Sequence, residues 1–266
     1  MTHQPYFSGF DPLPSDIESS LMVEAKPLYL NSEGSADTVV ICLHGFTGVP
    51  YEVAPAVKAI AATGLTAVAP LLPGHGYRHR PDQEREFARI TKAGMLAAAR
   101  QEIARAREHY SHVGMLGFSM GGAIALSMAA EGLLDACAVV APALRLPLRG
   151  ELLIPLLTWL PFVLPAKPSE PFHLPVYEFH HSWALRTLWQ LRRHARRQLP
   201  QIRCPLLGVH SQNDLTVPPV VLDLMQSKVP KPVETVWFND SGHVMLLDKS
   251  GAEVASTVTE FFQHHL

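Results

Sequence analysis

The chain is poor in residues that could cross-link it or bind a metal ion. Its 266 residues include three cysteines, an odd number without Cys-x-x-Cys spacing, and no His-Glu-x-x-His motif. We therefore expect neither a disulfide framework nor a metal site. Cys42 and Cys137 lie inside apolar runs, and Cys204 directly precedes another. All three are predicted to be buried, reduced thiols.

Strong net charge and long apolar runs are missing as well. A formal charge of −2 provides no overall field that would attract nucleic acid or acidic membranes. The most apolar stretch, residues 152–166, is interrupted by prolines and is shorter than the ~20 residues that span a bilayer. Residues 1–6 lack the basic and apolar regions of a signal peptide. These absences predict a cytoplasmic protein with no nucleic-acid partner and no stable membrane insertion, and they leave its oligomeric state open.

Apolar runs alternate with helical patterns along most of the chain. This β-α-β-α order, together with a hydrophobic content of 47%, is typical of an α/β domain whose mostly parallel sheet has helices on both faces. Strands are expected at residues 27–30 (antiparallel), 38–43, 65–69, 113–118, 135–141, 206–210 and 233–238. Helices are expected at residues 52–62, 81–110, 120–131, 218–228 and 249–265.

Residues 142–201 break this alternation. Eight prolines fall between Pro147 and Pro200, and most of the other residues there are large and apolar. A structureless loop of this length is uncommon inside a compact domain. We therefore predict that residues 1–141 and 202–266 form the core, and that residues 142–201 form an inserted, apolar cap.

A helix is expected at residues 182–199 of this cap, with one apolar face. The buried face would carry Trp183, Leu188, Leu191, Ala195 and Leu199. The arginines around that face are interpreted as a solvated surface, and a weak contact with lipid aggregates is the second interpretation. They are Arg186, Arg192, Arg193, Arg196 and Arg197.

The sequence Gly-Phe-Ser-Met-Gly at residues 117–121 lies between an expected strand and an Ala-rich helix. A serine at such a junction is held in a tight turn that exposes its oxygen above the sheet, and the glycines let strand and helix pack closely. Serine is a weak nucleophile unless a base lies within hydrogen-bond reach and a third group orients that base. Ser119 is therefore the predicted nucleophile.

Candidates for the base and the acid follow later strands. The carboxyl ends of parallel strands meet at one edge of the sheet, and Asp214 and His243 each follow such an end. The order Ser119, Asp214, His243 matches that of the α/β-hydrolase nucleophile elbow and its partners. Asp240 is a rival acid, but it is too close to the histidine along the chain. A turn-forming role for Asp214 before Pro218 is the structural alternative.

An oxyanion hole requires two donors aimed at the developing negative charge. We assign them to the backbone N–H groups of Met120 and of Phe46, in the glycine-containing loop after the strand at 38–43. His44 is expected to brace this loop, and His75 either to brace its own loop or to line the site. The substrate pocket is expected to include Phe46, His75, Leu153, Trp159, Val217 and Val244.

Six short motifs carry a family resemblance. They are His-Gly-Phe-Thr-Gly (44–48), Pro-Gly-His-Gly (73–76), Gly-Phe-Ser-Met-Gly-Gly (117–122), Asn-Asp (213–214), Ser-Gly-His-Val (241–244) and Leu-Asp (247–248). With them, the chain resembles α/β-hydrolases, and more narrowly bacterial carboxylesterases and monoacylglycerol lipases. The resemblance implies ester hydrolysis through an acyl-serine, without metal or cofactor. The cap is more apolar than is expected of that group, so the substrate is not carried over.

An apolar cap above a serine suggests an acyl group as the part of the substrate that is covered. Each buried methylene contributes ~0.8 kcal/mol, which favours esters with short to medium acyl chains, monoacylglycerols among them. Two alternatives stay open, namely a carbon–carbon bond hydrolase with the same three residues and a non-catalytic small-ligand binder. Haloalkane dehalogenation is excluded because it needs an aspartate where Ser119 stands.

Overall fold

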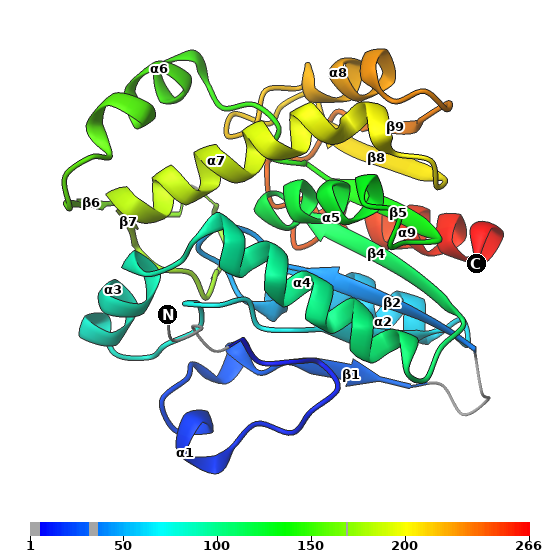
Figure 1. The fold of residues 1–266 in the computed structure, drawn as a ribbon, viewed down its shortest axis with the longest axis horizontal. Helices are drawn as coiled ribbons and strands as arrows, with labels where there is room; N and C mark the ends of the chain where they lie inside the picture. Colours follow the sequence, from blue (N-terminus) through cyan, green and yellow to red (C-terminus); the bar gives the residue numbers. More distant parts are fainter. Residues whose placement is uncertain (1–5, 32–36, 169) are drawn as a thin grey trace.

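The computed structural model describes residues 6–31, 37–168 and 170–266 (Figure 1). Residues 1–5, on which the expectation about a signal peptide rests, lie outside the described residues. The described residues include no helix with both the length and the apolar character needed to cross a membrane.

A seven-stranded sheet forms the centre of the molecule, with the order β1-β3-β2-β4-β5-β8-β9. Every neighbouring pair is parallel except β1 with β3, so the predicted α/β class is confirmed, including its antiparallel first strand. The strands are β1 (Leu28–Leu30), β2 (Thr38–Leu43), β3 (Thr66–Ala69), β4 (His112–Phe118), β5 (Ala136–Val140), β8 (Leu206–Ser211) and β9 (Glu234–Phe238).

Helices cover both faces of this sheet (Figure 1). Helices α2 (Ala54–Ala61) and α9 (Gly251–His265) pack together behind it in that view, and α4 (Lys92–Arg107) and α5 (Met120–Ala130) lie in front. Further helices are α1 (Ser15–Glu18), α3 (Arg80–Ala88) and α8 (Val221–Lys228). Turns of 3-10 helix lie at Val23–Ala25, Pro50–Val53 and Leu199–Gln201.

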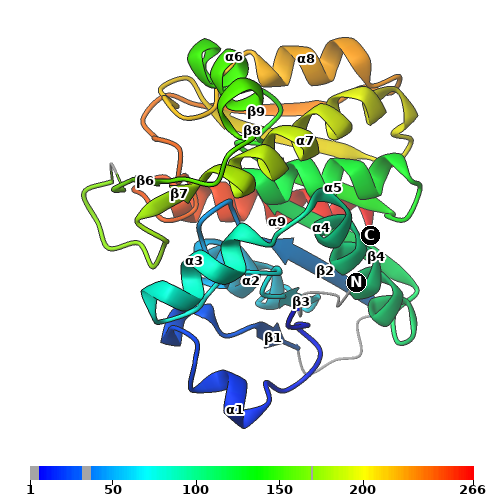
Figure 2. The same cartoon turned by 60° about the vertical axis from the view of Figure 1, so that its left-hand side comes forward.

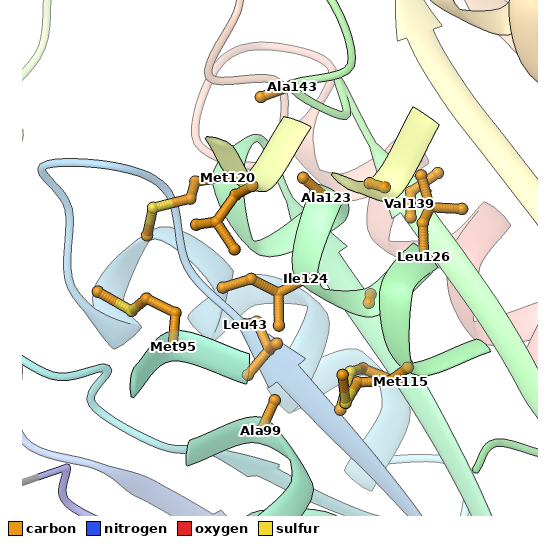
Figure 3. Close-up of a cluster of buried hydrophobic side chains, with 14 of the residues drawn as sticks. Leu43, Met95, Ala99, Met115, Met120, Ala123, Ile124, Leu126, Val139 and Ala143 are labelled. Atoms are coloured by element: carbon orange, nitrogen blue, oxygen red, sulfur yellow. The ribbon is translucent and has the colours of Figure 1, made fainter. Parts of the chain in front are cut away.

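The strands are buried on both faces because successive side chains point to opposite sides. In β2, Ile41 and Leu43 pack toward α4 and α5, whereas Val40 and Cys42 pack toward α2 and α9. Figure 3 shows the first of these two cores, where Leu43 lies beside Ile124 of α5. This two-sided burial explains why the strands are continuous apolar runs in the sequence.

The helix predicted at residues 81–110 is two helices, α3 and α4. The break falls at Thr91, whose hydroxyl accepts a hydrogen bond from the Gly94 N–H at 3.0 Å and so caps the start of α4. The Ala- and Arg-rich composition on both sides of this cap made the two helices look continuous.

Between β5 and β8, the chain forms α6 (Leu148–Leu157), β6 (Val163–Pro165), β7 (Phe179–His181) and α7 (Ser182–Gln198). Strands β6 and β7 pair as a separate antiparallel ribbon, which the sequence did not predict. Figure 2 shows α6 and α8 both above α7. The expected helix at 182–199 corresponds to α7, and a second helix accompanies it.

Two side chains of α7 differ from expectation. Trp183 was expected in the buried face, but it lies in the first turn and is exposed. Arg192 was expected in solvent, but only 1% of its surface is exposed and its guanidinium pairs with the Glu151 carboxylate of α6. The charge pattern alone could not reveal this pairing because Glu151 comes from a different helix.

The part of this segment that contains α6 and β6 is tied to the core on both sides. Before α6, the Ala143 N–H donates to the Ser119 carbonyl oxygen at 2.9 Å. Before β7, the Tyr177 N–H donates to the Thr47 carbonyl oxygen at 3.0 Å, and the Tyr177 hydroxyl donates to the Gly74 carbonyl oxygen at 3.1 Å. The described residues between these ties, 145–168 and 170–176, are called the arch below.

Candidate active site

Ser119 occupies the sharp turn between β4 and α5. Its φ of +52° lies in the left-handed region that side chains rarely adopt, and its N–H is held by the Val140 carbonyl at 3.0 Å. A Cβ on Gly117 would lie 2.3 Å from the Gly121 carbonyl oxygen, and one on Gly121 would lie 2.3 Å from the Leu43 carbonyl oxygen. Both glycines are therefore required if strand and helix are to pack this closely.

Ser119, His243 and Asp214 are brought together at the carboxyl ends of β4, β9 and β8. The Ser119 Oγ lies 3.0 Å from His243 Nε2, and His243 Nδ1 lies 2.7 Å from Asp214 Oδ2. Since a carboxylate only accepts hydrogen bonds, the Nδ1 of His243 carries the proton. The Nε2 lone pair is thereby left to accept the serine proton.

The Asp214 carboxylate is fixed on its other side. Its Oδ1 accepts the N–H groups of Thr216 and Val217 at 2.8 and 2.9 Å. Burial opposes ionisation of this carboxyl, but the hydrogen bond and charge of His243 and the Val217 N–H outweigh it and lower the pKa of Asp214. Asp214 is therefore ionised although it is buried away from solvent.

The loop that carries His243 is braced by Asp248. Its carboxylate accepts the Ser241 hydroxyl and, at 3.1 Å, the Gly242 N–H. Asp240, the rival acid, is exposed and lies 3.7 Å from the Lys249 ammonium, whereas His243 Nδ1 is paired with Asp214. The Leu-Asp motif that follows the histidine thus has a positioning role.

Met120 follows Ser119 directly, and Phe46 lies with Ser119 in the wall of one cavity. Met120 is the first residue of α5, and an N–H in the first helical turn has no partner within the helix. His75 Nε2 lies 2.6 Å from the Phe46 carbonyl oxygen, whereas Phe46 itself contributes to the cavity wall. The expectation that His75 lines the pocket is corrected: it is buried beneath the loop and braces it.

His44 braces the same loop from within. Its Nε2 accepts the Leu72 N–H at 3.1 Å, so its Nδ1 carries the proton and donates to the Gly45 carbonyl oxygen at 3.0 Å. Burial and the nearby His75 lower the pKa of His44 well below its usual value. The ring is a neutral structural element, as the sequence indicated.

Glu52 is the residue of this site that the sequence did not reveal. Its buried carboxyl accepts the Gly45 N–H at 2.8 Å and contributes to the cavity wall. A Cβ on Gly48 would lie 2.0 Å from this carboxyl, so the loop wraps directly over it. The only sequence signal was an acid in an otherwise apolar segment beside the glycine loop.

Burial raises the pKa of Glu52 to about 7 from 4.5, while the Gly45 N–H and His243 oppose the shift. The folded protein therefore holds a proton that the unfolded chain loses near pH 4.5, so this group's contribution to stability is lost as pH rises through 7. We expect Glu52→Gln to raise the free energy of unfolding relative to the unmodified chain at pH 8 by up to about 3 kcal/mol, and to give no such gain at pH 4.5.

Urea unfolding of both proteins at the two pH values measures this difference. Glu108→Gln, at an exposed side chain of the C-cap residue of α4, is the matched control. An equal gain for Glu52→Gln at both pH values would contradict the assignment.

A cavity of about 520 Å³ lies in front of Ser119 and His243. Phe46, Val217 and Val244 lie in its wall, where the sequence placed them. Leu153 and Trp159 do not: both are exposed at the surface of the segment between β5 and β8. Gly150 and Ile154, one helical turn apart on α6, face the cavity instead. Residues 152–157 of α6 are apolar on every side of the helix. Their sequence therefore could not indicate which face turns toward the cavity.

His210 lies behind Asp214 and was also missed. The Ser211 N–H donates to its Nδ1 at 2.8 Å, and burial lowers the pKa of His210 to about 4, so the ring is neutral.

Among the described residues, no His, Cys, Asp and Glu side chains form a group of three that could hold a metal ion.

Comparison with known proteins extends over nearly the whole chain. Residues 40–257 match the alpha/beta hydrolase family. A thermostable monoacylglycerol lipase from a Bacillus species is 29% identical over 253 residues, which are 91% of this chain and 95% of that protein. The resemblance that the six motifs indicated is thereby confirmed.

Solved structures share the fold. One, from work on the metagenome-derived lipolytic enzymes LipS and LipT, has a TM-score of 0.84 at 25% identity and covers 92% of this chain and 100% of that one. A monoacylglycerol lipase of Paleococcus ferrophilus has a TM-score of 0.72 at 14% identity, covering 91% and 99% of the two chains. Because the family match spans most of its length, the chain belongs to the alpha/beta hydrolase family.

Proposed function

We propose that this protein hydrolyses carboxylic esters through an acyl-serine intermediate, with Ser119 as nucleophile, His243 as base and Asp214 as orienting acid. The observation that carries the proposal is the relay from Ser119 Oγ to His243 Nε2 and from His243 Nδ1 to Asp214, at 3.0 and 2.7 Å, at the wall of a cavity. The lipolytic relatives support the same reaction class.

In the first half of the reaction, Ser119 Oγ attacks the ester carbonyl carbon as His243 Nε2 takes the hydroxyl proton. The carbonyl oxygen gains negative charge and is stabilised by the N–H groups of Met120 and Phe46. Asp214 stabilises the imidazolium that forms. His243 then returns the proton to the leaving alcohol, and the acyl group stays on Ser119.

In the second half, water takes the place of the alcohol. His243 removes a proton from the water as its oxygen attacks the acyl carbon, and the oxyanion hole again holds the charge. Collapse of this intermediate breaks the bond to Ser119, whose oxygen regains its proton from His243. The products are a carboxylic acid and an alcohol, and no cofactor takes part.

The cavity wall supports short to medium acyl chains as substrates. Residues 142–201 act in this proposal as a cap, with the core formed by residues 1–141 and 202–266. The relatives named as monoacylglycerol lipases make a monoacylglycerol a candidate substrate. We propose that the substrate is a small-molecule ester and that the protein acts in the cytoplasm. The apolar side chains that would contact the acyl chain are Leu146, Ile154, Leu174, Val176, Leu188 and Val217.

An ester panel tests the proposal. We expect kcat/KM to rise as the acyl chain of a p-nitrophenyl ester lengthens from two to eight carbons, because each methylene that enters the cavity contributes up to ~0.8 kcal/mol. Ile154→Ala, which enlarges the cavity, is expected to reduce the preference for the eight-carbon ester several-fold. Leu153→Ala, its outward-facing neighbour, is expected to leave that preference unchanged.

Two outcomes would overturn parts of this proposal. Equal activity on all chain lengths would rule out an acyl-binding cavity while leaving ester hydrolysis in place. Cleavage of a diketone or enol-ketone without any ester activity would favour a carbon–carbon bond hydrolase instead.

A further inference from the structure

The outer face of α6 is unusually apolar for a surface helix. Leu156 is 71% exposed, and Trp159, just beyond the helix, is 69% exposed. Away from this segment, the large exposed apolar side chains of the described residues are mostly isolated, Val23 and Tyr51 among them. Those of α6 instead form one continuous apolar surface. A patch of this kind marks an interaction surface. Its members are Leu148, Leu152, Leu153, Leu156, Leu157 and Trp159, and we call them the leucine face.

Folding of the described chain does not account for the leucine face. The packing needs of α6 are met by its other sides, where Ile154 faces the cavity and Glu151 pairs with Arg192 of α7. Five leucines at solvent-facing positions therefore contribute little to the core. They are exposed to water unless something covers them.

A basic groove adjoins the leucine face. It lies between α6, α7 and α8, and its wall includes Glu151, Arg193, Arg196, Arg197 and Lys228. Glu151, the acid of this group, is already paired with Arg192. Within the described chain, none of the other four forms a salt bridge, although Arg193 stacks on Trp189 at 4.4 Å. The groove therefore keeps an excess of positive charge.

The position of the basic groove beside the leucine face indicates what kind of partner binds there. Figures 1 and 2 both place α6 and α8 at the same end of the molecule, above α7. Arginine also joins the apolar face directly, since the Arg186 guanidinium lies 4.1 Å from the Trp159 ring centroid. An apolar face bordered by cations matches the boundary between acyl chains and anionic headgroups. A second copy fits less well, because a two-fold interface would bring the two basic grooves toward each other.

We propose that the leucine face docks on an anionic lipid surface, with the α7 and α8 cations against the headgroup phosphates. Helix α6 carries the leucine face on one side and part of the cavity wall on the other. Docking therefore brings the cavity of the proposed ester hydrolase next to the lipid from which an acyl ester would come. The inference deepens the proposed function but does not depend on the chemical step.

Cosedimentation with lipid vesicles tests this surface in the full-length protein. We expect binding to vesicles that contain phosphatidylglycerol, weaker binding to pure phosphatidylcholine, and a decline with added salt. Leu156→Ser should reduce the partition coefficient about 10-fold, and Arg197→Glu, which changes the charge by two units, about 30-fold. Their matched controls are Val23→Ser and Lys58→Glu, exposed positions away from α6, which should bind as the unmodified chain does.

Hydrolysis of a water-soluble short-chain ester, measured in parallel, separates the two proposals. All four variants should retain it, because none of these side chains lines the cavity, and its retention shows that they fold. Absence of vesicle binding by an active protein would overturn the docking proposal alone. Equal loss in the control variants would overturn it too, as would a dimer that Leu156→Ser dissociates while vesicles fail to bind.

Discussion

Ser119→Ala is expected to lower kcat for ester hydrolysis by at least ~10³-fold while the fold stays intact. The substitution removes the atom that forms the acyl bond and leaves His243 with no hydroxyl to deprotonate. Alanine is smaller than serine, and the Ser119 backbone contacts to Val140 and Ala143 involve main-chain atoms only, so little stability should be lost. Initial rates at saturating ester, together with thermal unfolding, measure both effects.

Covalent labelling makes the same prediction directly visible. A fluorophosphonate should add its mass to Ser119, and the label should be absent from Ser119→Ala and strongly reduced in His243→Ala, since the base activates the nucleophile. Ser127→Ala is the matched control, because that serine is buried in α5 and its hydroxyl donates to the Ala123 carbonyl. Retention of most activity in Ser119→Ala would move the nucleophile elsewhere. A folded chain that takes no label at all would favour a non-catalytic ligand binder.

Gly121→Ala is expected to cost about 3 kcal/mol or more in free energy of unfolding. The added Cβ would lie 2.3 Å from the Leu43 carbonyl oxygen and 2.7 Å from that of His44. Both are backbone atoms at the end of β2, in the centre of the sheet, and cannot move aside as a flexible side chain would. Urea unfolding of the variant and the unmodified chain gives the difference.

Gly150→Ala is the matched control. A Cβ there would meet its nearest neighbour, on Leu146, at 3.4 Å, which is ordinary contact, and alanine is the better helix former by ~1 kcal/mol. This variant should therefore be as stable as the unmodified chain or slightly more so. Similar stability losses in the two variants would mean that the close approach of α5 to β2 is not what requires glycine.

The fold was predictable from the sequence because its strands are buried on both faces and its helices are punctuated by glycine. The loops that follow strand ends could be identified for the same reason, which is how Ser119, Asp214 and His243 came to be assigned together. Long-range pairing was not predictable. The ion pair between Arg192 and Glu151 joins two helices, and nothing along either helix indicates its partner.

The inner and outer sides of α6 were beyond sequence reasoning for a related reason. After Glu151, residues 152–157 of this helix are apolar on every side and have no amphipathic period, so Leu153 and Ile154 could not be told apart. The sequence did not mark Glu52 as a site residue because a single acid near a glycine loop is common in surface turns. Its buried position is a consequence of the chain folding back over Gly48, which is a property of the tertiary structure.

The two ties that hold the arch have a mechanical consequence. A rotation at its base, at Ala143, would pull on the Ser119 carbonyl and so displace the nucleophile. A rotation at Tyr177 would drag the loops that contain Thr47 and Gly74. Any widening of the cavity that keeps both ties must therefore take place within the arch, where α6 is also held to α7 by the Glu151–Arg192 pair and β6 is held to β7 by strand pairing.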